Sequence, residues 1–160
     1  MPHSDSDHDP ALVAREIIDA NQYLTLATAD GDGHPWATPV WFAHDGYRDF
    51  LWISRPEARH SRNIAARPEI AVAIFDSTVP AGTGKAVYAE ALAAELDGPE
   101  RDRAIAIFTR RSEVNGAGRW SPADVAAPAQ FRLYRARASA HFVLDDHDRR
   151  IAVDPHGQSS

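Results

Sequence analysis

Alternating apolar and polar residues in the first third of the chain predict β-strands that bury one face. In residues 23–29 (YLTLATA), Leu24, Leu26 and Thr28 fall on one face and the residues between them on the other. The Asp-Gly-Asp-Gly segment at 30–33 is a strong turn signal. A hairpin is therefore expected to begin with this strand.

The chain continues as a meander of strands rather than as alternating β-α-β units. Residues 36–44 (WATPVWFAH) form the second predicted strand, and Asp45-Gly46 turns the chain into a third at 47–54 (YRDFLWIS). Residues 70–76 and 131–144 have strand-like length and composition. Residues 86–96 fit a strand or a helix by composition, and Val87, Tyr88 and the Gly98-Pro99 break favour a strand. Six strands of this kind favour a closed antiparallel barrel over a doubly wound sheet.

Helix-start signals and helical spacing predict helices around these strands. Asp9-Pro10 is typical of a capped helix start, and a helix is expected over 11–22. Its predicted apolar stripe consists of Leu12, Val13, Ile17 and Ile18. Further helices are expected at 58–67, at 99–111 and, briefly, from Ser121-Pro122. The predicted fold class is mainly β with peripheral helices.

The length of 160 residues predicts a single domain. Residues 1–9 and 155–160 are polar and low in bulky apolar side chains, so we expect both ends to be disordered tails. The folded domain is then expected to span 10–154.

Composition and charge exclude several classes of function. The formal net charge of −6 argues against a nucleic-acid partner, which requires a clustered cationic surface. Lys85 is the only lysine among 17 basic residues, and the planar fork of arginine suits local phosphate binding. The absence of cysteine excludes disulfides, thiolate catalysis and Cys-ligated zinc. No secretory signal or membrane-length apolar run is visible, so we expect a cytoplasmic protein without a membrane partner.

Two short motifs are better explained as loops than as sites. Gly82-Thr83-Gly84-Lys85 lacks the earlier glycine and the following Ser or Thr that a phosphate-binding P-loop requires. Asp145-Asp146-His147-Asp148 follows a predicted strand and is typical of a solvated acidic turn, with no further ligand set to support a metal.

Three stretches of the chain together resemble a known family. They are LATADGDGHPWATPVWF (26–42), LWIS (51–54) and ARHSRNIAARPEIAVAIFD (58–76). In order and spacing they resemble the pyridoxamine 5′-phosphate oxidase-like flavin-binding split-barrel family, with weaker agreement at FRLYRA (131–136). This resemblance implies a six-stranded antiparallel split β-barrel.

The resemblance also implies a binding site for FMN, held mostly by backbone groups of the second and third strands. The residues implied along the flavin ring are Thr38, Pro39, Val40, Trp41, Trp52, Ile53 and Ser54. The residues implied at the phosphate, at the start of the next helix, are Arg59 and His60, followed by Arg62 and Asn63. No catalytic residue and no metal ligand is identified.

Two departures from the family pattern bear on activity. His60 stands where relatives typically have lysine, and a neutral histidine makes an anion site weaker and dependent on pH. The chain after residue 95 lacks the Tyr/Arg/Ser set and the C-terminal dimer motif of true pyridoxamine phosphate oxidases. Oxidation of vitamin B6 is therefore not expected.

The leading hypothesis is an FMN-dependent oxidoreductase of unknown substrate, formed as a homodimer with the cofactor at the interface, as the resemblance implies. Alternatives are a deazaflavin-dependent reductase, a non-catalytic module that binds flavin or haem, and a dimeric interaction protein without a ligand. Trp36, Trp41 and Trp52 also fit a role as core or interface aromatics. Arg59, Arg62 and Arg67 also fit a solvated helix face.

Overall fold

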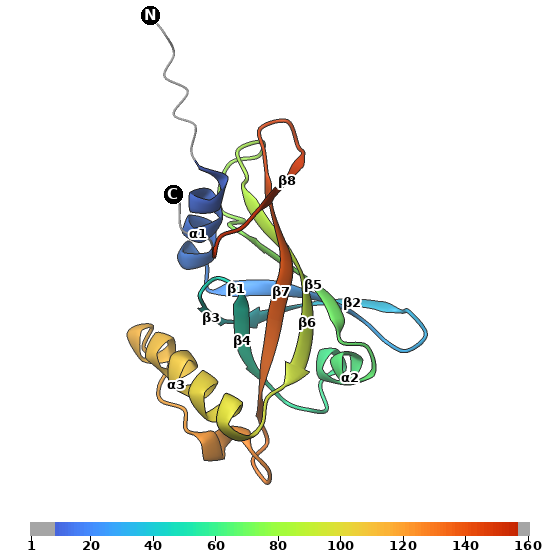
Figure 1. Cartoon of the computed structure of the whole chain (residues 1–160), viewed down its shortest axis with the longest axis vertical. Coiled ribbons are helices and arrows are strands. Elements are labelled where there is room, and N and C mark those ends of the chain that lie inside the picture. The colour runs from blue at the N-terminus through green and yellow to red at the C-terminus, as the bar shows by residue number, and fades with distance from the viewer. Residues whose placement is uncertain (1–8, 157–160) are drawn as a thin grey trace, which may run out of the picture.

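Eight antiparallel strands form one curled sheet that wraps around the main hydrophobic core (Figure 1). The structure is a computed structural model and describes residues 9–156. The strands are β1 Tyr23–Ala29, β2 Pro35–Trp41, β3 Ala43–Asp45, β4 Asp49–Ser54, β5 Glu69–Phe75, β6 Ala86–Glu95, β7 Arg132–Leu144 and β8 Arg150–Val153. Their order in the sheet is β2-β1-β5-β6-β7-β4-β3, with β8 paired to β7. The predicted mainly β architecture is confirmed.

Two of the eight strands were not predicted, and both are short. The predicted strand 36–44 divides into β2 and β3 at Phe42, where the alternation breaks because Phe42 and Ala43 are both buried. The chain bends there, leaves β1 and pairs with β4 instead. The second addition, β8, forms a hairpin with β7 across the predicted acidic turn. Neither segment carries a long alternating pattern, so six strands was an undercount.

Helices cover the open parts of the sheet (Figure 1). They are α1 Pro10–Ala20, α2 Arg59–Ala66, α3 Gly98–Val114 and the 3₁₀ helix η1 Pro122–Val125. Asp9 caps α1, and its carboxylate accepts a hydrogen bond from the Ala11 N–H at 3.1 Å. Ala14 and Ile18 are the buried side chains of α1, whereas Leu12 of the predicted stripe is 42% exposed. Leu12 lies two positions from Ala14 and therefore points away from the sheet.

Two clusters of buried side chains hold these elements together. The larger cluster fills the concave face of the sheet and includes Ile18, Leu26, Phe42 and Trp52. A smaller cluster joins the outside of β4 and β7 to α3 and η1, with Leu51, Leu133, Ile105 and Val125 among its members. α3 is thus packed onto the sheet through its own apolar contacts.

The last described residues pack against the domain. The Pro155 carbonyl accepts a hydrogen bond from the Arg15 guanidinium at 3.1 Å, and His156 Nδ1 lies 2.7 Å from the Gly46 carbonyl oxygen. The remainder of the two predicted tails, 1–8 and 157–160, lies outside the described residues. Within residues 9–156, even the longest helix, α3, falls short of the length and apolarity that a membrane crossing demands.

Candidate functional site

The sheet has a seam where its two ends approach each other. β2 is an end strand that pairs only with β1, and it comes close to β4 on its other side. β3 covers β4 only opposite Asp49–Leu51, so the edge of β4 at Trp52–Ser54 has no strand paired to it on the β2 side. Backbone N–H and C=O groups along an unpaired edge need other partners. The seam therefore offers main-chain donors and acceptors to a ligand.

A groove of about 490 Å³ follows this seam, and we call it the seam groove. Its volume lies in the range of roughly 300–1,000 Å³ that is usual for small-molecule sites. On the sheet side it is lined by Pro39, Val40 and Trp41 of β2, Ile53 and Ser54 of β4, and His60 of α2. No lining residue is Asp, Glu, Lys or Arg, so the walls suit an uncharged, flat molecule.

The first turn of α2 lies at one end of the seam groove. Its N-cap is Ala58, which has no side chain able to cap, so the first backbone N–H groups of the helix have no side-chain partner. His60 Nε2 lies 2.8 Å from Ser54 Oγ, which joins this turn to β4. Burial lowers the pKa of His60, so its imidazole is neutral at pH 7. A helix N-terminus of this kind attracts anions.

Arg59 supplies a positive charge beside this turn. Its guanidinium lies 4.2 Å from the centroid of the Trp36 ring, a cation–π contact. Trp36 is 41% exposed, so it is not a core residue. Arg59 is itself exposed and does not line the seam groove. Its guanidinium lies on the surface beside an exposed ring, where it is free to turn towards an anion at the helix start.

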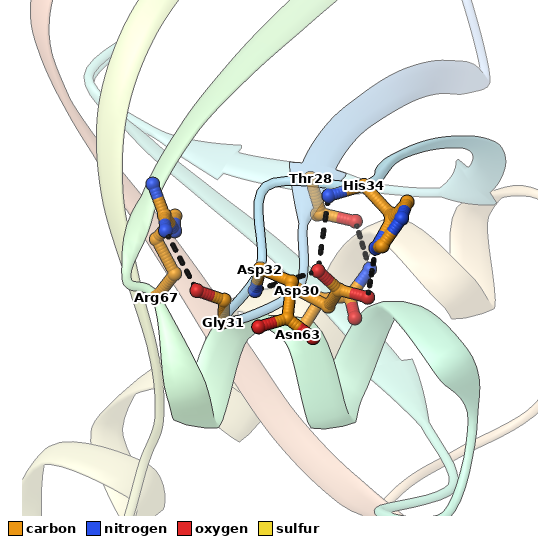
Figure 2. A network of polar contacts seen from close by, with 7 residues as sticks. All are labelled: Thr28, Asp30, Gly31, Asp32, His34, Asn63 and Arg67. Carbon is orange, nitrogen blue, oxygen red and sulfur yellow. Dashed lines mark hydrogen bonds and ion pairs between the residues drawn. The ribbon is translucent and has the colours of Figure 1, made fainter.

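α2 is fixed in place by a polar network at the turn between β1 and β2 (Figure 2). The buried Asn63 amide donates a hydrogen bond to Thr28 Oγ1 at 3.1 Å, and the Arg67 guanidinium donates to the Gly31 carbonyl at 3.2 Å. Within the turn, Asp30 Oδ1 accepts from the N–H groups of Asp32 and His34, each at 2.9 Å. These bonds hold the helix that carries His60 against the hairpin that carries β2.

The same turn contains the one group of three metal-ligand side chains found in residues 9–156, Asp30, Asp32 and His34. Both oxygens of Asp30 already have partners, because Oδ2 also contacts His34 Nδ1 at 3.1 Å. Hydrogen bonds from the turn and from His34 lower the pKa of Asp30. The cluster is therefore accounted for as a hydrogen-bonded turn.

The other side of the seam groove is an aromatic wall built from α3 and the chain that follows it. Its lining residues are Phe108 and Ser112 of α3 together with Ala117, Trp120 and Phe131. Trp41 and Phe108 meet edge-to-face at 5.2 Å, and Phe108 and Trp120 at 6.5 Å between centroids. The wall therefore locks Trp41 by packing as well as lining the groove.

The residues implied by sequence are only partly brought together. Six of them line the seam groove: Pro39, Val40, Trp41, Ile53, Ser54 and His60. Trp52 is completely buried and stacks on Tyr134 at 5.9 Å, so its side chain belongs to the core. Asn63 is engaged with Thr28, and Thr38, Arg59 and Arg62 do not line the groove. The residues that line the groove are consecutive along β2 and β4, so the groove follows the two strand edges rather than one face of either strand.

Sequence reasoning did not identify the α3 wall. A helix was predicted at 99–111. Nothing in the sequence indicates that the C-terminal part of this helix, with Phe108, faces β2 across the groove. The signal that exists is the aromatic spacing of Phe108, Trp120 and Phe131 in a segment otherwise rich in small and polar residues. That spacing alone does not distinguish a groove wall from core packing.

Two other hollows lack these features. The largest, about 760 Å³, is an open depression between α3 and η1 that shares Trp120 with the seam groove. Another of about 670 Å³ lies between residues 82–85 and the 145–148 turn, which places the two motifs set aside from the sequence next to each other. Asp145 accepts hydrogen bonds from the N–H groups of His147 and Arg149, as expected of a turn residue. Neither hollow combines an unpaired strand edge with a helix N-terminus.

Comparisons with known proteins agree with this architecture. A family model described as pyridoxamine 5′-phosphate oxidase matches residues 13–155. A haem-binding protein from Mycobacterium smegmatis is similar with a TM-score of 0.71 and 20% identity, over 92% of this chain and 58% of that one. The chain thus spans little more than half of that protein. A haem storage protein from Vibrio cholerae is similar with a TM-score of 0.64 and 21% identity, over 81% and 90%.

An F420 reductase is also similar, with a TM-score of 0.58 and 22% identity over 79% of this chain and 94% of that one. A search of curated proteins gives no match. At these identities the structural likenesses show the fold, and they confirm the predicted split-barrel architecture.

Proposed function

The chain belongs to the pyridoxamine 5′-phosphate oxidase family, and we propose that it binds FMN in the seam groove and acts as a flavin-dependent oxidoreductase. The observation that carries the proposal is the juxtaposition of two features at one groove. One is the pair of unpaired strand edges of β2 and β4, and the other is the uncapped N-terminus of α2. A flavin needs hydrogen bonds along its ring and charge compensation at its phosphate.

Each part of the groove has a separate task in this proposal. Backbone groups at Thr38–Trp41 and Trp52–Ser54 bind the polar edge of the ring. The α2 N-terminus, His60 and Arg59 bind the phosphate, and Arg59 leaves the Trp36 ring to do so. Asn63 and Arg67 position α2 through the hairpin turn. Phe108, Trp120 and Phe131 exclude water from the ring.

The bound flavin would supply the redox chemistry, and the chain supplies binding, orientation and shielding. No side chain in the groove is assigned as a general acid or base. Oxidation of vitamin B6 phosphates is not proposed, because the chain after residue 95 lacks the Tyr/Arg/Ser set of true pyridoxamine phosphate oxidases. A deazaflavin coenzyme has a similar ring and is the alternative cofactor for the same groove. The likeness to an F420 reductase supports keeping this alternative.

We propose a homodimer interface on the outer face of β1, β5 and β6. The residues of this face do not line the seam groove, so this interface differs from the cofactor-bridging one that the family resemblance implies. An antiparallel sheet that packs one face on a core is expected to be polar on the other. Here the outer face exposes Tyr23 by 60%, Phe75 by 53% and Leu92 by 57%. Ala27 and Ala71 lie between them as paired neighbours on β1 and β5. Exposed Glu69 and Glu90 lie beside Leu92 and Ala71 on the same face, so the proposed interface combines large apolar side chains with carboxylates.

The test of the proposed function is an absorption spectrum of purified protein followed by titration with FMN. We expect flavin absorbance near that of free FMN, or saturable quenching of FMN fluorescence when the cofactor is added. Absence of binding of both FMN and a deazaflavin at micromolar concentrations contradicts the proposal. Arg59→Ala is expected to weaken FMN binding and to leave riboflavin binding unchanged, because riboflavin has no phosphate.

A haem-binding module is the second candidate, and one observation favours it. The neutral imidazole of His60 stands in a groove with four aromatic side chains, and neutral imidazole is a common iron ligand. The likeness to two haem proteins adds support. Under this alternative, added haemin gives a sharp Soret band that His60→Ala abolishes. Under the FMN proposal, His60→Ala leaves any haemin spectrum unchanged.

A further inference from the structure

Three buried side-chain atoms in the described part of the chain have no hydrogen-bond partner: Trp52 Nε1, Arg111 Nε and Ser112 Oγ. Buried polar groups without a partner are destabilising and therefore rare, so each calls for an explanation. Among these three residues, Ser112 alone lines the seam groove. Ser112 is 1% exposed.

Ser112 lies on the α3 side of the seam groove. It lies on α3, one turn after Phe108, and Ala117 and Trp120 line the groove beside it. Apart from His60 and Ser54, it is the one hydroxyl or imidazole in a lining otherwise made of apolar and aromatic residues and proline. His60 and Ser54 already satisfy each other at 2.8 Å. The unpaired polar group of the groove is therefore at the α3 wall.

We propose that the Ser112 hydroxyl forms a hydrogen bond with the polar edge of the bound flavin ring, so that the ring lies at the α3 wall and the phosphate at α2. This inference rests on the proposed function and adds the orientation of the cofactor. Two parts of the groove match two parts of FMN. One is the uncapped N-terminus of α2, with Arg59 in its first turn. The other is the α3 wall, with aromatic faces and a single hydroxyl.

The hydrogen-bonding need of Ser112 is met only when the ligand is present. In the ligand-free protein the unpaired, buried hydroxyl destabilises the fold, so its removal is expected to stabilise it. In the complex the same hydroxyl contributes to affinity. A serine with a purely structural role behaves in the opposite way, because its removal destabilises the ligand-free protein.

The test compares Ser112→Ala with the wild type in binding FMN and riboflavin. Ser112→Ala is expected to raise the Kd of both flavins equally, by about three- to tenfold, because both carry the same ring. The Tm of ligand-free Ser112→Ala is expected to rise by about 2–4 °C.

Three outcomes overturn the proposal, and they are separable. Unchanged riboflavin affinity in Ser112→Ala overturns the contact with the ring, while FMN binding by the wild type keeps the proposed function. A lowered Tm of ligand-free Ser112→Ala assigns the hydroxyl a structural role. A wild-type protein that binds neither FMN nor riboflavin overturns the proposed function itself.

Discussion

At the scale of single residues, the protonation state of His60 sets the affinity of the groove for a phosphate. Burial lowers the pKa of His60, whereas a phosphate bound beside it favours the charged imidazolium. Binding of FMN should therefore take up a proton, so that affinity rises as the pH falls towards the pKa of His60. Because His60 is neutral at pH 7, it binds the phosphate more weakly than a lysine at the same position would.

We predict that the affinity for FMN increases as the pH is lowered from about 8 to 6.5, while riboflavin affinity stays constant. His60→Lys should bind FMN about three- to tenfold more tightly at pH 7.5 and remove this dependence. Fluorescence titration at each pH measures both effects. An identical pH profile for FMN in the wild type and in His60→Lys would show that His60 does not face the phosphate.

His141 is a second buried histidine, and it affects the stability of the fold. Its Nε2 donates to the Tyr47 carbonyl at 2.8 Å, and burial is the main cause that lowers its pKa. The neutral form is then favoured in the folded state, so its contribution is fully present above the unfolded pKa of about 6.5 and decreases below it. The Tm should fall between pH 7.5 and 5.5, and less so in His141→Gln. Equal losses in both proteins would count against this origin.

At the scale of elements, α2 is the segment whose position matters most, and its two anchors differ in burial. Asn63 is 4% exposed, whereas the Arg67 bond lies at the surface. Asn63→Ala leaves Thr28 without its donor and should cost about 1–3 kcal/mol of unfolding free energy. Arg67→Ala should cost about 0.5 kcal/mol or less. Denaturant unfolding measures the free energy of unfolding of both variants. Equal losses would contradict the prediction that Asn63 contributes more than Arg67.

Element prediction from the sequence was strongest where pattern and turn chemistry agree. Residues 23–29 form β1 with the predicted buried face, because alternation and the following Asp-Gly turn point the same way. The predicted stripe of α1 failed at Leu12, since several faces of that helix are apolar and only packing selects one. β3 was not predicted as a separate strand. Phe42 and Ala43 are both buried, so no alternating pattern marks the bend between β2 and β3.

At the scale of the whole molecule, the candidate site depends on contacts that are distant in sequence. The sheet side of the seam groove was implied by the resemblance to the family, whose ordered motifs lie on β2, β4 and α2. The α3 wall could not be predicted, because Phe108 and Ser112 reach the groove only through the packing of α3 on β3 and β4. Trp52 was placed along the flavin ring, yet its side chain points to the core side of β4.

The outer sheet face provides a test at the same scale. Leu92→Arg replaces an exposed apolar side chain of the proposed interface with a charge and should convert a dimer into a monomer. Val114→Arg is the control, since Val114 is 87% exposed at the end of α3 and away from this face. Sedimentation velocity measures the assembly. A wild-type monomer, or a Leu92→Arg protein that remains dimeric, would remove this interface from the account.

The central claim is that the seam groove binds a flavin. Titration of FMN into the purified wild-type protein at pH 7.5, followed by flavin fluorescence, tests it most directly. The account predicts saturable quenching with one FMN bound per chain and a micromolar or lower Kd. A linear fluorescence response without saturation, repeated with a deazaflavin, would contradict it.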